Sequence, residues 1–225
     1  MRTLIAVVTC HKYAERADAV RRTWARDVHA SGADVRFFYG VPEGTENAPL
    51  PDDSVMLPVD DGYTALALKV KMMLAWALAQ GYDRIFKCDD DAYIIPARLL
   101  SMGSTFDYVG NFRAPNGEYP YPYASGFCYM LSARAAKIVV DRPYAEGDDT
   151  MEDRYVGNTL GPFECMPLNF VDEKRFICCY PGVSEPTVLW WSPIGKTHAV
   201  YAQYPANMFG GLHHWYKVAF QGQQA

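Results

Sequence analysis

The amino-acid sequence predicts a single α/β domain, in which a mostly parallel central sheet is flanked by helices. Short apolar runs that suit buried strands alternate with segments whose apolar residues recur at helical spacing, and this alternation is typical of a parallel sheet with helical crossovers. The length of 225 residues and the hydrophobic content of 50% are enough for one generous core. We therefore expect residues 1–225 to fold as one domain.

The amino-terminal quarter predicts the order strand, helix, strand, strand. Residues 3–9, TLIAVVT, form an apolar run with the length of a buried strand. Residues 11–30 place alanine, valine and tryptophan side chains at helical spacing, and Gly32 follows this segment. Two further short runs, residues 34–40 and 54–59, predict strands on either side of a polar loop rich in proline.

The clearest helix prediction begins at Tyr63 and ends at Gly81. Its apolar positions form one continuous stripe: Leu66, Ala67, Val70, Met73, Leu74, Ala77 and Leu78. Residues 82–88 then predict a strand, and three aspartates, residues 89–91, follow directly at its carboxyl end. In open α/β sheets, that end of the strands is where ligands bind.

The rest of the chain continues the pattern with shorter elements. We expect helices at residues 96–102, at 133–141 and from near Glu152, and strands at residues 107–111 and 126–132. The last third predicts short strands and a closing amphipathic helix, at residues 175–180, 187–191, 196–201 and 205–220.

Composition and charge exclude some classes of partner. There are 26 acidic and 21 basic residues, which give a formal net charge of −5, and no stretch dense in lysine and arginine suits nucleic acid. No secretory signal and no run long enough to span a membrane are seen. The six cysteines show no C-x-x-C spacing, so we expect mostly free thiols in a reducing, cytoplasmic environment.

Three adjacent carboxylates after an apolar strand favour a positive partner. Like charges at neighbouring positions repel, and each loses hydration when the site is enclosed. Mg²⁺ and Mn²⁺ prefer oxygen ligands and take many of them from phosphates and water, so one or two protein carboxylates are enough. The triplet therefore fits a divalent metal held between protein and a diphosphate, and a solvated turn is the alternative. It does not fit a calcium loop, because the D-x-D-x-D-G spacing is missing.

Four ordered blocks of the sequence resemble the β-1,3-galactosyltransferase and fringe-like glycosyltransferase family. They are RADAVRRTWARD at residues 16–27, the stretch from DGYTAL to KCDDDAYI at 61–94, YPYASGFCYMLSARAA at 121–136, and MEDRYVGNTLG at 151–161. The resemblance implies a GT-A fold and an inverting, metal-dependent transfer from a nucleoside diphosphate sugar, usually a UDP-sugar. A departure is Ala65, which stands where the family has asparagine.

The same resemblance implies the reaction. We expect a hexose or N-acetylhexosamine to move to a hydroxyl group of a glycan or glycoconjugate acceptor, with a β-1,3-type linkage. Residues 1–110 are then the donor half and residues 111–225 the acceptor and catalytic half. Family members are usually anchored in the Golgi, so the Golgi lumen is the expected location if the sequence is a piece of a longer chain.

The family pattern also suggests catalytic and metal-binding residues. Asp153 matches the position of the general base, with Glu152 as the nearby alternative. For Mn²⁺ or Mg²⁺ we expect Asp91 as the main ligand, Asp89 directly or through water, and His198 as the third. Asp90 is expected to contact hydroxyl groups of the donor.

Donor and acceptor residues follow from position and from the blocks. Thr9 and Cys10 lie at the end of the first predicted strand, where the base and ribose would bind, and Arg16 and Arg21 are placed to reach phosphate or to fix that loop. Lys69 is a candidate donor contact, and Lys87 a structural counter-charge. On the acceptor side we expect Tyr123, Ser125 and Gly126, with Trp191 stacking on a sugar face.

Two other functions use some of the same features. A nucleotidyltransferase acting on a sugar phosphate also uses paired carboxylates and a divalent ion, but the loop TCHKYAERAD lacks the glycines expected around a triphosphate. A non-catalytic sugar-binding module would leave the block at residues 151–161 unexplained.

Overall fold

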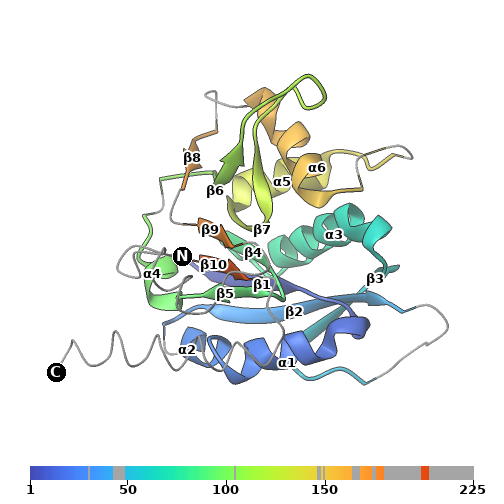
Figure 1. Cartoon of the computed structure of the whole chain (residues 1–225), viewed down its shortest axis with the longest axis vertical. Helices are drawn as coiled ribbons and strands as arrows, with labels where there is room; N and C mark the ends of the chain where they lie inside the picture. The colour runs from blue at the N-terminus through green and yellow to red at the C-terminus, as the bar shows by residue number, and fades with distance from the viewer. Residues whose placement is uncertain are drawn as a thin grey trace.

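A computed structural model describes residues 1–29, 31–42, 49–103, 105–145, 148, 150–163, 168–173, 176–179 and 199–202. Within these residues a seven-stranded sheet has the order β3-β2-β1-β4-β7-β6-β8 (Figure 1). Its strands are β1 (Thr3–Val8), β2 (Asp34–Val41), β3 (Ser54–Asp60), β4 (Arg84–Asp89), β6 (Tyr108–Arg113), β7 (Tyr123–Ser132) and β8 (Phe170–Asp172).

The sheet is mixed but mostly parallel, as the sequence predicts. Strand β1 pairs in parallel with both β2 and β4, and β2 pairs in parallel with β3. Strand β7 runs antiparallel between β4 and β6. The register places Val8 of β1 beside Asp89 of β4, so both strands end at the same edge of the sheet.

Helices cover both faces of this sheet. They are α1 (Ala14–Arg22), α2 (Ala25–His29), α3 (Leu66–Ala79), α4 (Pro96–Leu100), α5 (Ala133–Asp141) and α6 (Glu152–Leu160). Successive residues of β1 point to opposite faces: Ile5 and Val7 pack in a cluster with α1, α2 and α4, and Leu4 and Ala6 in a cluster with α3, α5 and α6. Figure 1 shows the resulting three layers, with α1 and α2 on the opposite side of the sheet from α3.

The expected helix at residues 11–30 is divided. A short 3₁₀ turn (η1, His11–Tyr13) precedes α1, and the chain breaks at Thr23, where φ is −114° and ψ is −114°. The Thr23 hydroxyl donates to the Ala19 carbonyl (2.7 Å), and the buried Trp24 indole donates to the Ala92 carbonyl (3.0 Å). Trp24, in the turn between α1 and α2, therefore anchors the backbone that follows the aspartate triplet.

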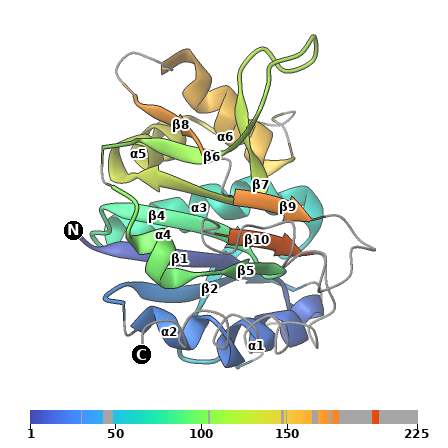
Figure 2. The same cartoon turned by 60° about the vertical axis from the view of Figure 1, so that its left-hand side comes forward.

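A second, three-stranded sheet contains that backbone. Its strands are β5 (Ala92–Ile94), β10 (Ala199–Ala202) and β9 (Phe176–Cys179), in that order, and Figure 2 shows it beside β7. The strand predicted at 187–191, the closing helix at 205–220, and the site candidates Trp191 and His198 lie outside the described residues. Along the described part of the chain, no helix has the length and apolar character needed to cross a bilayer.

Candidate active site

The carboxyl ends of β1 and β4 open into a cavity of about 830 Å³. Its wall includes most of the predicted donor residues: Thr9, Cys10, Arg16, Lys69 and all three aspartates of the triplet. A nucleotide with its diphosphate is of the size that such a cavity holds. The cavity therefore lies at the edge of the sheet that the sequence predicts as the ligand-binding edge.

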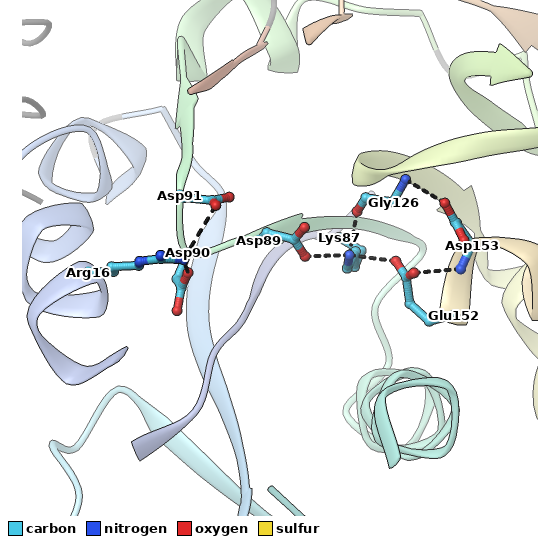
Figure 3. A network of polar contacts seen from close by, with 8 residues as sticks. All are labelled: Arg16, Lys87, Asp89, Asp90, Asp91, Gly126, Glu152 and Asp153. Atoms are coloured by element: carbon cyan, nitrogen blue, oxygen red, sulfur yellow. Dashed lines mark hydrogen bonds and ion pairs between the residues drawn. The ribbon is translucent and has the colours of Figure 1, made fainter. Parts of the chain in front are cut away.

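The three carboxylates of the triplet point in two directions (Figure 3). Asp90 and Asp91, only 5% and 6% exposed, face the loop after β1 and helix α1. The Thr9 hydroxyl donates to Asp90 Oδ2 at 2.8 Å, and Nη1 of Arg16 lies 3.5 Å from Asp90 Oδ1 and 3.4 Å from Asp91 Oδ2. Asp89 instead turns toward Lys87.

The buried pair of aspartates carries more negative charge than its surroundings balance. Burial raises the pKa of Asp90 to about 6, against the lowering effect of the Thr9 hydroxyl. Burial, followed by the charges of Asp89 and Asp90, raises the pKa of Asp91 to about 7. Among the described residues, Asp91 Oδ1 is a buried atom that has no hydrogen-bond partner. A divalent cation would offset these costs, so the residues present fit one side of a metal–diphosphate site.

The described residues do not form a complete metal cage. No group of three or more His, Cys, Asp or Glu side chains in this part of the chain is arranged to hold an ion. Such a cage is not required of a site in which phosphate and water supply the other ligands.

Lys87 lies at the centre of a second polar cluster, on the other side of Asp89. Its side chain is 1% exposed, and its Nζ atom donates to Asp89 Oδ1 and Glu152 Oε1, at 2.6 Å each, and to the carbonyl of Gly126. Burial by itself would lower the pKa of Lys87, but the charges of Asp89 and Glu152 raise it well above its usual value. The expected counter-charge is therefore a fixed, fully ionised ammonium group.

The two catalytic candidates stand at the first turn of α6, beside this cluster. Asp153 accepts the Gly126 amide at 3.1 Å through Oδ2 and the Arg154 amide at 2.8 Å through Oδ1. Glu152 accepts the Asp153 amide at 2.5 Å through Oε2. Burial raises the pKa of Glu152 to about 7 and also raises the pKa of Asp153, while the charge of Lys87 acts against both shifts. A carboxylate with a raised pKa is suited to take a proton near neutral pH.

Known proteins with similar sequence and structure are glycosyltransferases. Residues 15–107 match the model of the galactosyltransferase family. Mouse β-1,3-galactosyltransferase 5 is 23% identical over 229 residues, which cover 87% of this chain and 73% of the mouse protein. A glycosyltransferase involved in glycosylation of the major capsid of PBCV-1 has a TM-score of 0.58 at 13% identity and covers 95% of this chain and 99% of its own. This chain is a GT-A glycosyltransferase.

Other matches agree with the fold and with the family that the motif blocks resemble. Galactosyltransferase LgtC, in a complex with donor and acceptor sugar analogs, has a TM-score of 0.50 at 12% identity and covers 94% of this chain and 95% of its own. The hydroxyproline O-galactosyltransferase GALT5 of Arabidopsis thaliana is 29% identical over 61% of this chain. The glycosyltransferase described here spans only 25% of the length of that plant protein.

In this glycosyltransferase Lys69 is a buried anchor of the cavity wall. It is 2% exposed, and its Nζ atom donates to the Thr9 carbonyl at 3.0 Å and to Asp61 Oδ1 at 2.6 Å. Asp61 Oδ2 in turn accepts the His11 amide at 2.7 Å and lies 2.9 Å from its Nδ1 atom. Lys69 thus holds the loop after β1 in place from the opposite wall of the cavity.

The other site residues predicted for the glycosyltransferase, within the described part of the chain, are not among the residues that line the cavity. Arg21 forms a two-pronged contact with Asp53 and lies over the Phe37 ring, with 3.9 Å to its centroid, so it fixes helix α1 on the sheet. Gly126 lies beside Glu152 and Asp153. Ser125 accepts a hydrogen bond from Arg113 Nε at 2.9 Å, and Tyr123 packs on α6.

The cavity residues of the glycosyltransferase that were not predicted from the sequence include three polar ones on its wall: His11, Asp61 and Tyr63. Asp61 and Tyr63 belong to the block that begins DGYTAL, whose order of residues was the available signal. His11 carried no signal, because only the fold brings it to Asp61. Among the cysteines of the described part, Cys10, Cys88 and Cys128 are free thiols, as expected.

Proposed function

We propose that this enzyme transfers a hexose or N-acetylhexosamine, with inversion, from a UDP-sugar to a hydroxyl group of a glycan or glycoconjugate, in a reaction that depends on Mn²⁺ or Mg²⁺. The observation that carries the proposal is the placement of two carboxylate pairs on either side of Lys87. Asp90 and Asp91 border the donor-sized cavity, and Glu152 and Asp153 lie beyond Asp89, at the start of α6.

The donor binds in the cavity at the ends of β1 and β4. Asp91 is the main protein ligand of the metal, Asp89 contributes directly or through water, and Asp90 accepts hydrogen bonds from donor hydroxyl groups. When bound, the divalent ion neutralises the charge that grows on the departing diphosphate. Arg16 adds a positive charge at the same wall.

The acceptor hydroxyl loses its proton to Asp153. Both candidate carboxylates are buried, but Glu152 is paired with the Lys87 ammonium group at 2.6 Å, which makes it the poorer base. Asp153 accepts only backbone amides at its two oxygens among the hydrogen bonds given above, and these orient the carboxylate without neutralising its charge. This assignment places the donor functions in residues 1–110 and the base in residues 111–225.

The relatives suggest where to begin with substrates. The mouse relative is named a β-1,3-galactosyltransferase and the plant relatives are named galactosyltransferases, so UDP-galactose is the first donor to test, with a β-1,3 linkage as the expected product. Slow hydrolysis of a panel of UDP-sugars, followed by released UDP, identifies the donor without knowledge of the acceptor. Hydrolysis that requires Mn²⁺ or Mg²⁺ supports the proposal.

The substitution Asp153→Asn tests the base. A general base contributes about 10²–10⁴-fold to the rate, so turnover should fall by that factor while UDP binds in the presence of Mn²⁺ as before. Loss of UDP affinity with turnover preserved would refute the role. A preference for a nucleoside triphosphate over UDP would instead favour a nucleotidyltransferase, and sugar binding without any metal-dependent UDP binding would favour a non-catalytic module.

A further inference from the structure

We propose that Lys87 and Glu152 are positioning residues, which hold the carboxylate of Asp153 in place from inside the sheet and are not themselves touched by either substrate. The inference rests on the proposed function, since it concerns how the base of that reaction is fixed. It separates the roles of two neighbouring acids that the sequence leaves interchangeable.

Lys87 is positioned to join several elements of the fold. Its ammonium group reaches three different elements: Asp89 at the end of β4, the Gly126 carbonyl on β7, and Glu152 on α6 (Figure 3). At 1% exposure the lysine is closed off from any ligand. A buried cation with three acceptors fixes the relative positions of the segments that supply them.

A closed chain of contacts connects Lys87 to the base. Lys87 holds Glu152 through Oε1, and Glu152 Oε2 accepts the backbone amide of Asp153. Asp153 Oδ2 then accepts the amide of Gly126, whose carbonyl returns to Lys87. Each member of this ring of contacts restrains the next. Both side-chain oxygens of Asp153 accept backbone amides, Oδ2 that of Gly126 in the ring and Oδ1 that of Arg154 outside it.

Gly126 has no room for a side chain at this point. A Cβ atom built there would lie 3.0 Å from Glu152 Oε2, 3.1 Å from Glu152 Oε1 and 3.3 Å from Asp153 Oδ2. Both carboxylates therefore pack directly on the backbone of β7. A side chain at this position would displace them by a few tenths of an ångström, which gives a second way to perturb the ring without touching Lys87.

The charge of Lys87 also keeps the base ionised. Burial raises the pKa of Asp153, and the nearby ammonium group opposes that rise. The charged and titratable groups that interact with Asp153 come from several elements: Lys87, Glu152, Arg154, Tyr63, Tyr108 and Tyr129. Removal of a positive neighbour should therefore move the acid limb of the pH–rate profile to higher pH. Removal of a negative neighbour should move it to lower pH.

The test measures UDP-sugar hydrolysis against pH for two variants. In Lys87→Met the base loses its cation, so kcat should fall by about tenfold or more and the acid limb should move to higher pH. In Glu152→Gln one negative charge is lost and one acceptor oxygen remains, which can serve Lys87 but leaves the Asp153 amide without its acceptor. Turnover should therefore fall less than in Asp153→Asn, and the acid limb should move to lower pH. UDP affinity with Mn²⁺ should change little in Glu152→Gln.

Controls keep the result independent of folding. Lys71 is a control lysine on α3, whose Nζ atom donates to the carbonyls of Val139, Val140 and Arg142, none of which belongs to the ring. Lys71→Met should lower the melting temperature and leave the pH profile in place. If Lys87→Met does not fold, Gly126→Ala replaces it, and its kcat should fall while UDP affinity is kept.

Three outcomes would overturn the inference. If Glu152→Gln abolishes turnover as completely as Asp153→Asn, Glu152 is the base. If wild type is active but neither the Lys87 nor the Glu152 variant moves the acid limb, and Gly126→Ala keeps its kcat, the ring does not position the base. If wild type hydrolyses no UDP-sugar at any pH, the proposed function fails and this inference falls with it.

Discussion

The substitution Lys69→Met should destabilise the protein because it leaves the Asp61 carboxylate without its counter-charge. Lys69 is almost wholly buried, and its ammonium group lies 2.6 Å from Asp61 Oδ1. Breaking a buried ion pair from one side costs about 3–5 kcal/mol, because the remaining charge has lost its compensation. Asp61 borders the donor cavity and keeps its hydrogen bonds from His11, so we expect the lower end, about 3 kcal/mol. In a chain of this size that loss lowers the melting temperature by about 6–12 °C.

The loss of folding stability in Lys69→Met should be larger at higher pH. In the wild type, hydrogen bonds from Lys69 and His11 lower the pKa of Asp61 even though burial alone would raise it. Such a group stabilises the fold above its unfolded-state pKa of about 3.9, and this stability is lost as the pH falls through the lower folded-state pKa. Without Lys69, burial raises the pKa of Asp61, so stability then decreases as the pH rises. The gap between variant and wild type should be wide at pH 7.5 and narrow at pH 4.5.

Thermal melts at both pH values, with a double variant and a surface control, measure this effect. Lys69→Met combined with Asp61→Asn removes the unpaired charge and should recover much of the loss at pH 7.5. Lys137→Met breaks an exposed pair with Asp141 and should change little. A gap that is the same at both pH values, or a double variant no more stable than the single one, would refute the reasoning.

Three further variants test other contacts of the site. Trp24→Phe leaves the buried Ala92 carbonyl without its donor, and denaturant unfolding should show a loss of about 1–3 kcal/mol. Tyr63→Ala removes a ring that is 66% exposed on the cavity wall, so kcat/KM for the UDP-sugar should fall several-fold while an unchanged melting temperature shows that packing is intact. Arg21→Met should lower the melting temperature and leave UDP affinity in calorimetric titration unchanged, because the guanidinium group is bound to Asp53; a large loss of affinity would place Arg21 at the phosphates.

The fold was largely predictable because its strands and helices carry their own local patterns. Strand β1 lies within the run predicted at residues 3–9, and the helix at 133–141 falls where the periodicity of apolar residues places it. The strand predicted at residues 82–88 is shifted to Arg84–Asp89, so the first aspartate of the triplet is the last residue of β4. The break at Thr23 could not be foreseen, since the contact that Trp24 makes beside it is with Ala92, 68 residues away. Local helical spacing carries no information about such a partner.

The sequence predicted many of the residues at the site, but it did not predict which of them form hydrogen bonds or ion pairs with one another. Adjacency in the sequence suggested that Asp89, Asp90 and Asp91 act together, but strand geometry turns Asp89 toward Lys87 and the other two toward Arg16. The pairing of Lys87 with Glu152 spans 65 residues and needs β7 and α6 in place. Motif order located these groups, and only the tertiary structure shows which of them touch.

The reversed direction of β7 has a consequence for how such enzymes diversify. Parallel strands deliver their last residues to the ligand edge, whereas an antiparallel strand delivers its first ones, so Gly126 arrives at this edge only a few residues after the β6–β7 connection. The exposed part of that connection, residues 114–118, can lengthen or change its composition without altering the pairing of Lys87 with Tyr129 further along the strand, whereas Tyr119 is buried against Arg154 of α6. A library of insertions there should thus explore new acceptors while the chemistry of the catalytic centre stays constant.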